Sequence, residues 1–110
     1  MAKNYIQCGD IIEYAAPYAV SSGDGALIGA RFGVAMVTLA QGARGNFSHE
    51  GVWKLPKAAG EAWTEGVKIY WDDANKRCTT TAGGNTLIGT ATAVAASADE
   101  TGNVLLEIVA

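Results

Sequence analysis

Residues 66–91 read GVKIYWDDANKRCTTTAGGNTLIGTA, and this stretch decides the class of fold. Within VKIYWD, residues 67–72, side chains alternate with the period of two that is typical of a half-buried strand. The second half is almost all threonine, glycine and alanine, and such small or β-branched side chains suit strands that pack tightly against a neighbour. Residues 73–75, DAN, supply the turn between the halves. The stretch therefore predicts strands and turns, not a helix.

Turn-forming residues recur at short intervals along the rest of the chain, and the segments between them are typical of strands. The expected strands cover residues 4–7, 10–15, 26–39, 47–55, 67–72, 77–81, 87–95 and 104–109. Residues 57–65 are the only plausible helix, and Gly60 limits it to one or two turns because glycine costs about 1 kcal/mol in a helix interior. The prediction is a mainly β protein, a small barrel or sandwich of about eight short strands with one short helix. We expect residues 1–110 to form a single domain, with residues 1–8 as an extended N-terminal arm.

The chain also contains an internal echo. Residues 23–29 read GDGALIG and residues 83–89 read GGNTLIG, and both would form a turn, a strand and a glycine. Two interpretations stay open, because the segments are either symmetry-related hairpins or a coincidence in a chain rich in glycine and alanine.

Charge and composition exclude several classes of protein. Charged residues make up 17% of the chain, against a usual share of about 25%, and the net charge is −3. The basic residues are scattered, whereas nucleic-acid binders cluster theirs to neutralise phosphates, so we expect no nucleic-acid partner. No apolar run approaches the ~20 residues of a membrane helix or forms a signal sequence, so we expect no membrane partner and synthesis in a cytoplasm. Cys8 and Cys78 show no metal-binding or redox spacing and are expected to be free thiols.

The residues that could carry catalysis do not form a recognisable set. His49 is the only histidine, and in the expected strand 47–55 it lies on the apolar face with Phe47 and Trp53. We expect it to be packed and hydrogen-bonded, although a catalytic pair with Cys8 or Cys78 is an alternative.

The remaining polar candidates point the same way. Asp72 and Asp73 would point to opposite faces of a strand and are better interpreted as turn formers than as a carboxylate pair. One histidine and two separated cysteines are too few for structural zinc, and no segment matches a calcium or phosphate loop. We therefore expect no enzyme activity, no metal and no cofactor.

Read as one piece, the chain resembles the small capsid cement, or head decoration, proteins of tailed bacteriophages and prophages, which were long described only as a domain of unknown function. The motifs that carry the resemblance are MAKNYIQ (1–7), EGVWKLPK (50–57), GEAW (60–63), GVKIYWD (66–72), TTT (79–81) and GNTLIG (84–89). They cover nearly the whole chain in the expected order.

This resemblance implies a non-enzymatic, mainly β subunit that binds the outside of a phage head and bridges its capsomeres. It also implies a major capsid protein as partner, a homo-oligomer with a trimer favoured, a location in the virion, and synthesis in the cytoplasm of a bacterial host. An N-terminal arm could add contacts by β-augmentation, so we expect Asn4, Tyr5, Ile6 and Gln7 to touch the capsid.

One alternative function is a phage-borne module that binds carbohydrate or a host surface through aromatic side chains. It predicts that at least two of Trp53, Trp63 and Trp71 are exposed, whereas in a cement protein they are core or subunit contacts.

Overall fold

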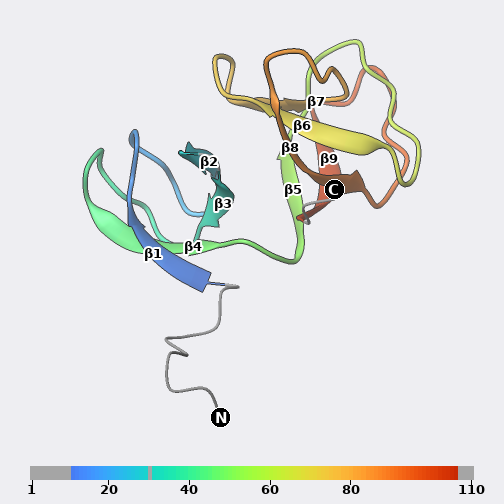
Figure 1. Ribbon diagram of the computed structural model, residues 1–110. Coiled ribbons are helices and arrows are strands. Elements are labelled where there is room, and N and C mark those ends of the chain that lie inside the picture. Colours follow the sequence, from blue (N-terminus) through green and yellow to red (C-terminus); the bar gives the residue numbers. More distant parts are fainter. Residues whose placement is uncertain (1–10, 30, 107–110) are drawn as a thin grey trace, which may run out of the picture.

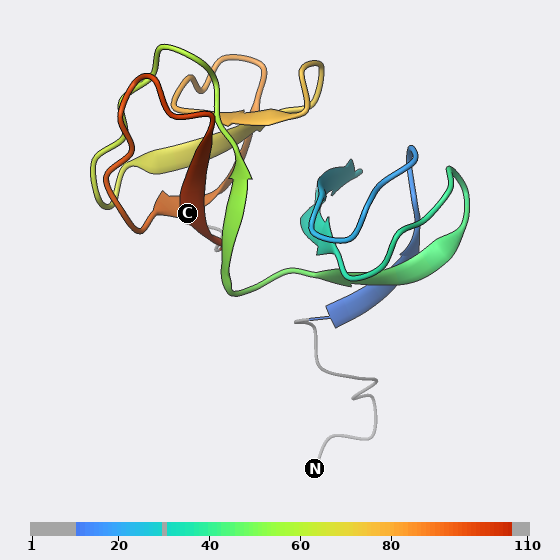
Figure 2. The same ribbon diagram turned by 180° about the vertical axis from the view of Figure 1, so that it is seen from behind.

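The structure, a computed structural model, describes residues 11–29 and 31–106. Within this part of the chain there are nine strands, all antiparallel, in two sheets (Figures 1 and 2). The first sheet has the order β1 (Ile11–Ala15), β4 (Arg44–Ser48), β3 (Arg31–Ala35) and β2 (Gly25–Ile28). The second has the order β5 (Val52–Pro56), β9 (Thr101–Leu106), β8 (Thr86–Ala91), β6 (Lys68–Asp72) and β7 (Arg77–Thr79). The mainly β class is confirmed.

The helix predicted over residues 57–65 is wrong, because this segment forms turns and isolated bridges. Its backbone amides donate to distant carbonyl groups and not to a preceding helical turn. The bonds run from Lys57 to Glu100, Ala58 to Cys78, Gly60 to Ser97 and Trp63 to Ala95. Gly60 also has a φ of 82°, which lies outside the helical region. Long-range pairing therefore overrides the local helix signal.

Two segments that were each predicted to be one strand are divided in the structure. Residues 26–39 turn back at Gly29, whose φ of 61° suits a glycine, and so supply both β2 and β3. Residues 47–55 are interrupted between β4 and β5, where Gly51 has a φ of 99°. Phe47 and Leu55 therefore lie in two different sheets and two different core clusters, and do not share a face.

The two sheets belong to two consecutive units of the same topology, which we call the first unit (residues 11–48) and the second unit (residues 52–106). When β7 is left out of the second unit, the first strand of each unit pairs with the last, the last with the third, and the third with the second. The equivalent strands are β1 and β5, β4 and β9, β3 and β8, and β2 and β6. Strand β7 is an addition to the second unit, on the outer side of β6.

The register of the strands is the same in both units. Val34↔Ser48 and Ala35↔Phe47 in the first unit correspond to Thr90↔Leu105 and Ala91↔Val104 in the second. Gly25↔Val34 and Ala26↔Gly33 likewise correspond to Lys68↔Thr90 and Ile69↔Gly89. The residue pairings of the two sheets therefore correspond one to one, up to the bulge in β6 after Ile69.

Backbone hydrogen bonds in the loops repeat in the same way. An isolated bridge joins Val20 to Leu39 in the first unit, and another joins Trp63 to Ala95 in the second. Three residues after the first residue of each bridge comes a glycine with positive φ. Its backbone amide donates to the carbonyl oxygen of the last residue of β3 in the first unit and of β8 in the second. These bonds run from Gly23 to Ala35 and from Gly66 to Ala91, and both are 2.8 Å long. The chain is thus a tandem repeat of one supersecondary unit.

Five positions that are buried in the first unit are also buried in the second, whereas Val34 is buried and its equivalent Thr90 is only partly buried. The pairs, with the first-unit residue first, are Ala16 and Lys57, Val20 and Trp63, Ala26 and Ile69, Ala35 and Ala91, and Phe47 and Val104. The larger and the smaller residue of the bridge change places between the units. In the first unit Val20 faces the larger Leu39, whereas in the second the large Trp63 stands at the position of Val20 and faces the small Ala95. A glycine in the last strand makes room for the larger member of each bridge, Gly45 beside Leu39 and Gly102 beside Trp63.

The echo between residues 23–29 and 83–89 does not mark this repeat. Its segments contribute to β2, an edge strand, and to β8, an interior strand, so they occupy different positions. The equivalent of β2 is β6, and the equivalent of β8 is β3. The interpretation of the echo as symmetry-related hairpins is therefore wrong, although a repeat exists in another register.

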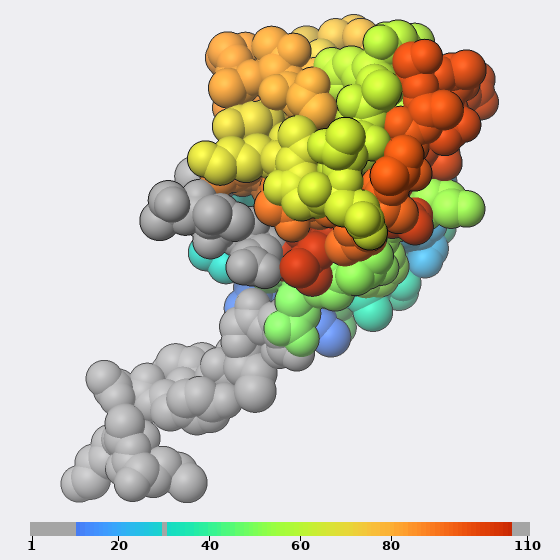
Figure 3. All heavy atoms as spheres, turned by 90° about the vertical axis from the view of Figure 1, so that its right-hand side faces the viewer, coloured from blue at the N-terminus to red at the C-terminus, as the bar shows by residue number. Residues whose placement is uncertain are grey.

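The two units pack against each other through apolar side chains. Val34 of the first unit belongs to the same core cluster as Leu55 and Trp71 of the second. The rings of Phe32 and Trp71 meet with their centroids 4.9 Å apart. Figure 1 shows the β4–β5 segment as the single covalent link between the sheets, and Figure 3 shows the side of the molecule that the second unit largely forms.

Candidate functional site

The predicted capsid contacts Asn4, Tyr5, Ile6 and Gln7 lie outside the described residues, as does Cys8. Three features of residues 11–29 and 31–106 bear on function: the polar side chains that sequence patterns singled out, a cleft between the units, and the exposed apolar side chains.

His49 is half-buried in the link between β4 and β5, not on the apolar face of a strand as predicted. Its Nδ1 lies 2.9 Å from the carbonyl oxygen of Phe32, and its ring stands edge-on to Tyr14 with centroids 5.6 Å apart. The prediction that His49 is packed and hydrogen-bonded is confirmed for Nδ1. Its Nε2 has no hydrogen-bond partner among the described residues.

Cys78 is a buried free thiol in the core of the second unit. Burial, with a contribution from Glu61, raises the pKa of this thiol to about 12. A thiolate is thus disfavoured at neutral pH, and His49 contacts other residues, namely Phe32 and Tyr14. The described residues do not assemble the catalytic pair of His49 and Cys78.

Asp72 is a turn former, as predicted, whereas the carboxylate of Asp73 binds other partners. Asp72 binds the backbone amide and the side chain of Asn75, at 3.3 and 2.7 Å, and these bonds lower its pKa. Asp73 turns toward the first unit, where its carboxylate is 3.4 Å from the Tyr18 hydroxyl. No group of three or more metal-binding side chains occurs among the described residues. In the same residues, no helix is long and apolar enough to cross a membrane.

A cleft of about 330 Å³ lies between the units. Its lining residues are Tyr18, Ala19, Asp24, Gly25, Pro56, Trp71 and Lys76. The same Asp73 oxygen that faces Tyr18 accepts a hydrogen bond from Trp71 Nε1, at 3.1 Å, and pairs with Lys76 Nζ, at 3.3 Å. Lys76 Nζ also stands 4.0 Å from the centre of the Tyr18 ring. Three residues that line the cleft, Tyr18, Trp71 and Lys76, are thus joined through the Asp73 carboxylate, which is the arrangement of a structural contact.

Tyr18 also covers the open edge of β2. Its hydroxyl donates to the carbonyl oxygen of Gly25, at 3.2 Å, and the backbone amide of Leu27 faces the Tyr18 hydroxyl oxygen. Burial raises the pKa of Tyr18 to about 12, and the Asp73 carboxylate adds to the rise. In the second unit, strand β7 covers the equivalent edge of β6. Because an uncovered edge can pair with another chain, Tyr18 protects the first sheet where β7 protects the second.

The tryptophans do not form a sugar-binding surface. Trp63 and Trp71 are buried, with 1% and 2% of their surface exposed, and Trp53 is half-buried. Trp53 Nε1 donates to the carbonyl oxygen of Glu50, at 2.9 Å. The prediction that at least two of the three are exposed is wrong, so the carbohydrate-binding alternative loses its main support.

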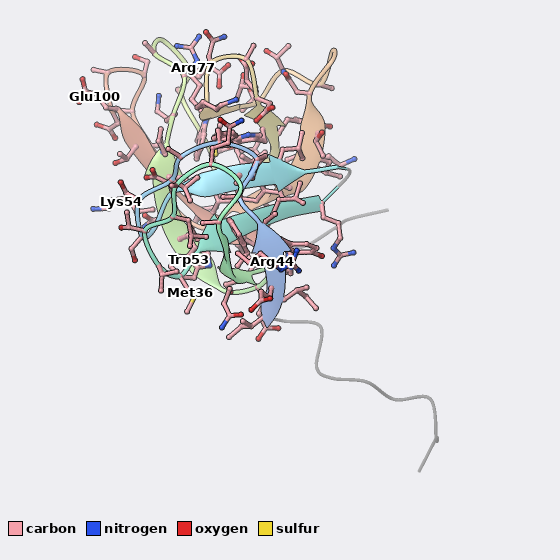
Figure 4. The ribbon with its side chains drawn as sticks, turned by 90° about the vertical axis from the view of Figure 1, so that its left-hand side faces the viewer. Met36, Arg44, Trp53, Lys54, Arg77 and Glu100 are labelled. Atoms are coloured by element: carbon pink, nitrogen blue, oxygen red, sulfur yellow. The ribbon has the colours of Figure 1, made fainter. Side chains whose placement is uncertain are left out.

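The exposed large apolar side chains are few, and sequence reasoning did not single them out. Among the described residues they are Ile11, Met36, Val37, Val52 and Val94, which are 41%, 40%, 47%, 57% and 72% exposed. Figure 4 shows Met36 at the lower end of the view, away from Arg77 and Glu100 at the upper end. Exposed apolar residues that occur singly or in pairs are common on protein surfaces. Their exposure depends on the fold, so no motif in the sequence marks them.

A family model described as phage cement protein matches residues 6–106 of the chain, a span that includes both units. No curated protein and no solved structure matches the chain.

Proposed function

We propose, because the chain belongs to the phage cement protein family, that it binds the outer surface of a tailed-phage head and bridges neighbouring capsid subunits. Membership gives it a structural role in the phage virion, in association with the capsid. The observation that carries the proposal is the extent of the family match, which runs through all nine described strands. The partner is the major capsid protein of the phage.

The described surface suits a protein that acts by contact alone. Its exposed large apolar side chains are few, and its buried polar residues Ser48, Lys57 and Thr79 make internal hydrogen bonds. Small contacts of this kind give weak binding singly. When several act together, avidity exceeds the affinity of one contact by about 10²–10⁴.

We further propose that residues 1–110 act as one domain and assemble into a homo-oligomer, with a trimer favoured. The protein is made in the host cytoplasm and needs neither nucleic acid nor membrane to act. Sedimentation equilibrium of the purified protein tests the oligomer. A trimer of the 11.4 kDa chain is expected, and a monomer at micromolar concentration would contradict it.

The N-terminal arm, residues 1–8, is proposed to add capsid contacts through Asn4, Tyr5, Ile6 and Gln7. The support is its position directly before β1, which is an edge strand of the first sheet. An arm that continues from an edge strand can pair with a strand of another protein. Deletion of residues 2–7 is expected to weaken binding to heads, and unchanged binding would refute a role of the arm.

The stabilising function is tested by adding the protein back to heads that lack it. Expanded, DNA-filled heads from a phage with the gene deleted are heated with and without purified protein, and the temperature of DNA release is recorded. We expect release at a higher temperature when the protein is present. An unchanged release temperature, at protein concentrations that saturate the heads, would contradict the proposed function.

A further inference from the structure

The strands β1 and β5 hold equivalent positions in the two units, and each is the outermost strand at one end of its sheet. Ile11 pairs with Ser48 in the first sheet, and Val52 pairs with Leu105 in the second. These two partners hold the same register position in β4 and β9, so Ile11 corresponds to Val52. The correspondence continues residue by residue along the two strands.

The exposed side chains of the two strands form the same pattern. Every second residue is exposed in both, beginning with the first. These residues are Ile11, Glu13 and Ala15 in β1, and Val52, Lys54 and Pro56 in β5. Each strand thus presents a large apolar residue, a charged residue at the centre and a second apolar residue. The large apolar residues, Ile11 and Val52, are 41% and 57% exposed.

The central residues carry opposite charges, although their positions are equivalent. The Glu13 carboxylate is bound through Oε1 to Arg44, at 3.1 Å, and its other oxygen has no partner among the described residues. The two side chains of this pair are 59% and 62% exposed, and a pair so exposed contributes little to stability. Lys54 forms no ion pair with any described residue. Both central charges are therefore accessible to an outside partner.

Glu13 and Lys54 lie apart within one chain. The strands that carry them belong to different sheets. Figure 4 shows Lys54 and Arg44, the partner of Glu13, on opposite sides of the molecule. The two opposite charges can therefore meet only between two copies of the chain.

We propose that the exposed side of β1 in one copy of this chain contacts the exposed side of β5 in a second copy, with Glu13 opposite Lys54. Each charge is the middle one of three exposed residues, so the charges face each other whether the strands run parallel or antiparallel. The apolar residues on either side then cover one another, which removes Ile11 and Val52 from water. The inference rests on the homo-oligomer of the proposed function, and it supplies the surfaces through which the copies join.

This contact joins two different surfaces, and every copy carries both. One copy offers β1 to one neighbour and β5 to another, so the copies join head to tail, and such contacts generate a ring when the rotation closes. A ring of three uses both surfaces of every copy, which agrees with the trimer proposed above.

The test reverses the two charges singly and together, as Glu13→Lys, Lys54→Glu and the double variant. Glu65→Lys and Lys68→Glu are the matched controls, because they make the same changes at exposed positions outside β1 and β5. Self-association of each full-length chain is measured by analytical ultracentrifugation, and thermal unfolding checks the fold. Glu13→Gln and Lys54→Gln replace any reversed chain that does not fold.

Each single reversal is expected to weaken self-association by about 10–100-fold, because like charges then face each other. A glutamine variant is expected to weaken it by about two- to fivefold, since only the attraction is lost. The double reversal restores opposite charges, so we expect it to associate like the wild type, as should both controls.

Binding of the same chains to expanded heads that lack the protein separates this inference from the proposed function. If the single reversals associate like the wild type, or if the double reversal does not recover, the inference is overturned while the proposed function stands. A reversal that weakens head binding and leaves the oligomer intact places the two strands against the capsid, which also overturns the inference. If the wild type binds no heads but the charge reversals act on the oligomer as expected, the proposed function fails and the contact between copies stands.

Discussion

The hydroxyl of Tyr18 lies 3.4 Å from the carboxylate of Asp73, and this contact joins the first unit to the second. The same carboxylate oxygen accepts from Trp71 Nε1, and Lys76 balances its charge. Because the other residues of this cluster belong to the second unit, Tyr18 is its only member from the first. The cluster therefore fixes the position of the units relative to each other and protects the edge of β2.

Replacing Tyr18 by phenylalanine is expected to lower the free energy of unfolding by about 1 kcal/mol, the usual net value of a partly buried hydrogen bond. Urea denaturation measures the change. Tyr70→Phe is the matched control, because the Tyr70 hydroxyl has no hydrogen bond to a described residue that would be lost. Equal effects of the two substitutions would contradict the role assigned to Tyr18.

Alkaline pH is expected to destabilise the fold. The pKa of Cys78 rises from 9.0 to about 12 and that of Tyr18 from 10.0 to about 12, mainly through burial. Between the unfolded and folded pKa values the folded state retains a proton that the unfolded state has lost, so stability falls as pH rises. Unfolding measured from pH 8 to pH 12 should show this decline.

Two variants show how much of the loss of stability at alkaline pH is caused by each of the two groups. Cys78→Ala should remove the part that begins near pH 9, and Tyr18→Phe the part that begins near pH 10. If the decline is the same in the wild type and in both variants, other groups cause it and the two assignments are wrong.

Glu61 is expected to stabilise the segment that was predicted to be helical. Partial burial acts to raise the pKa of Glu61, but hydrogen bonds from Thr79 and from the Thr80 backbone outweigh it, and the pKa lies below 4.5. The Nζ of buried Lys57 donates to the Glu61 carbonyl and adds a favourable charge. A lowered pKa gives stability that is present above the unfolded pKa and is lost as pH falls through the folded pKa.

Glu61→Gln should therefore lower the free energy of unfolding at pH 7 by about 1 kcal/mol. At pH 3 the difference from the wild type should be smaller. Glu65→Gln, at an exposed position nearby, is the control. A difference between Glu61→Gln and the wild type that does not shrink in acid would show that the carboxylate charge is not the stabilising feature.

The tandem repeat supplies a matched pair of glycine substitutions. A Cβ at Gly102 would lie 2.6 Å from Cε3 of the rigid Trp63 ring, whereas a Cβ at the equivalent Gly45 would meet the flexible end of Leu39 at 2.8 Å. Gly102→Ala should therefore destabilise the fold by about 1–3 kcal/mol, and Gly45→Ala by less. Gly83→Ala, where the space is open, is the control. Thermal unfolding ranks the three, and equal stability of the Gly102 and Gly45 variants would contradict the packing described.

The sequence predicts the strands better than their arrangement. Alternation over residues 67–72 correctly indicates β6, because one face of that strand is buried and the other is not. The segment 57–65 is predicted wrongly, since its backbone partners lie 20 or more residues away in the sequence, for example Glu100 for Lys57. Local patterns carry no information about such partners.

The repeat is hidden from the sequence for a physical reason. Equivalent core positions keep a similar total side-chain volume but not the same residues. For example, the pair Val20 and Leu39 in the first unit is replaced by the pair Trp63 and Ala95 in the second. The residues that do agree, such as Gly45-Asn46 and Gly102-Asn103, are short and common.

The most direct test of the central claim is co-sedimentation of the purified protein with expanded heads from the phage that encodes it, prepared without this protein. The account predicts saturable binding at a fixed ratio to the major capsid protein, reached at the outer surface of intact heads. Absence of binding to expanded heads, by a protein shown to be folded, would contradict it.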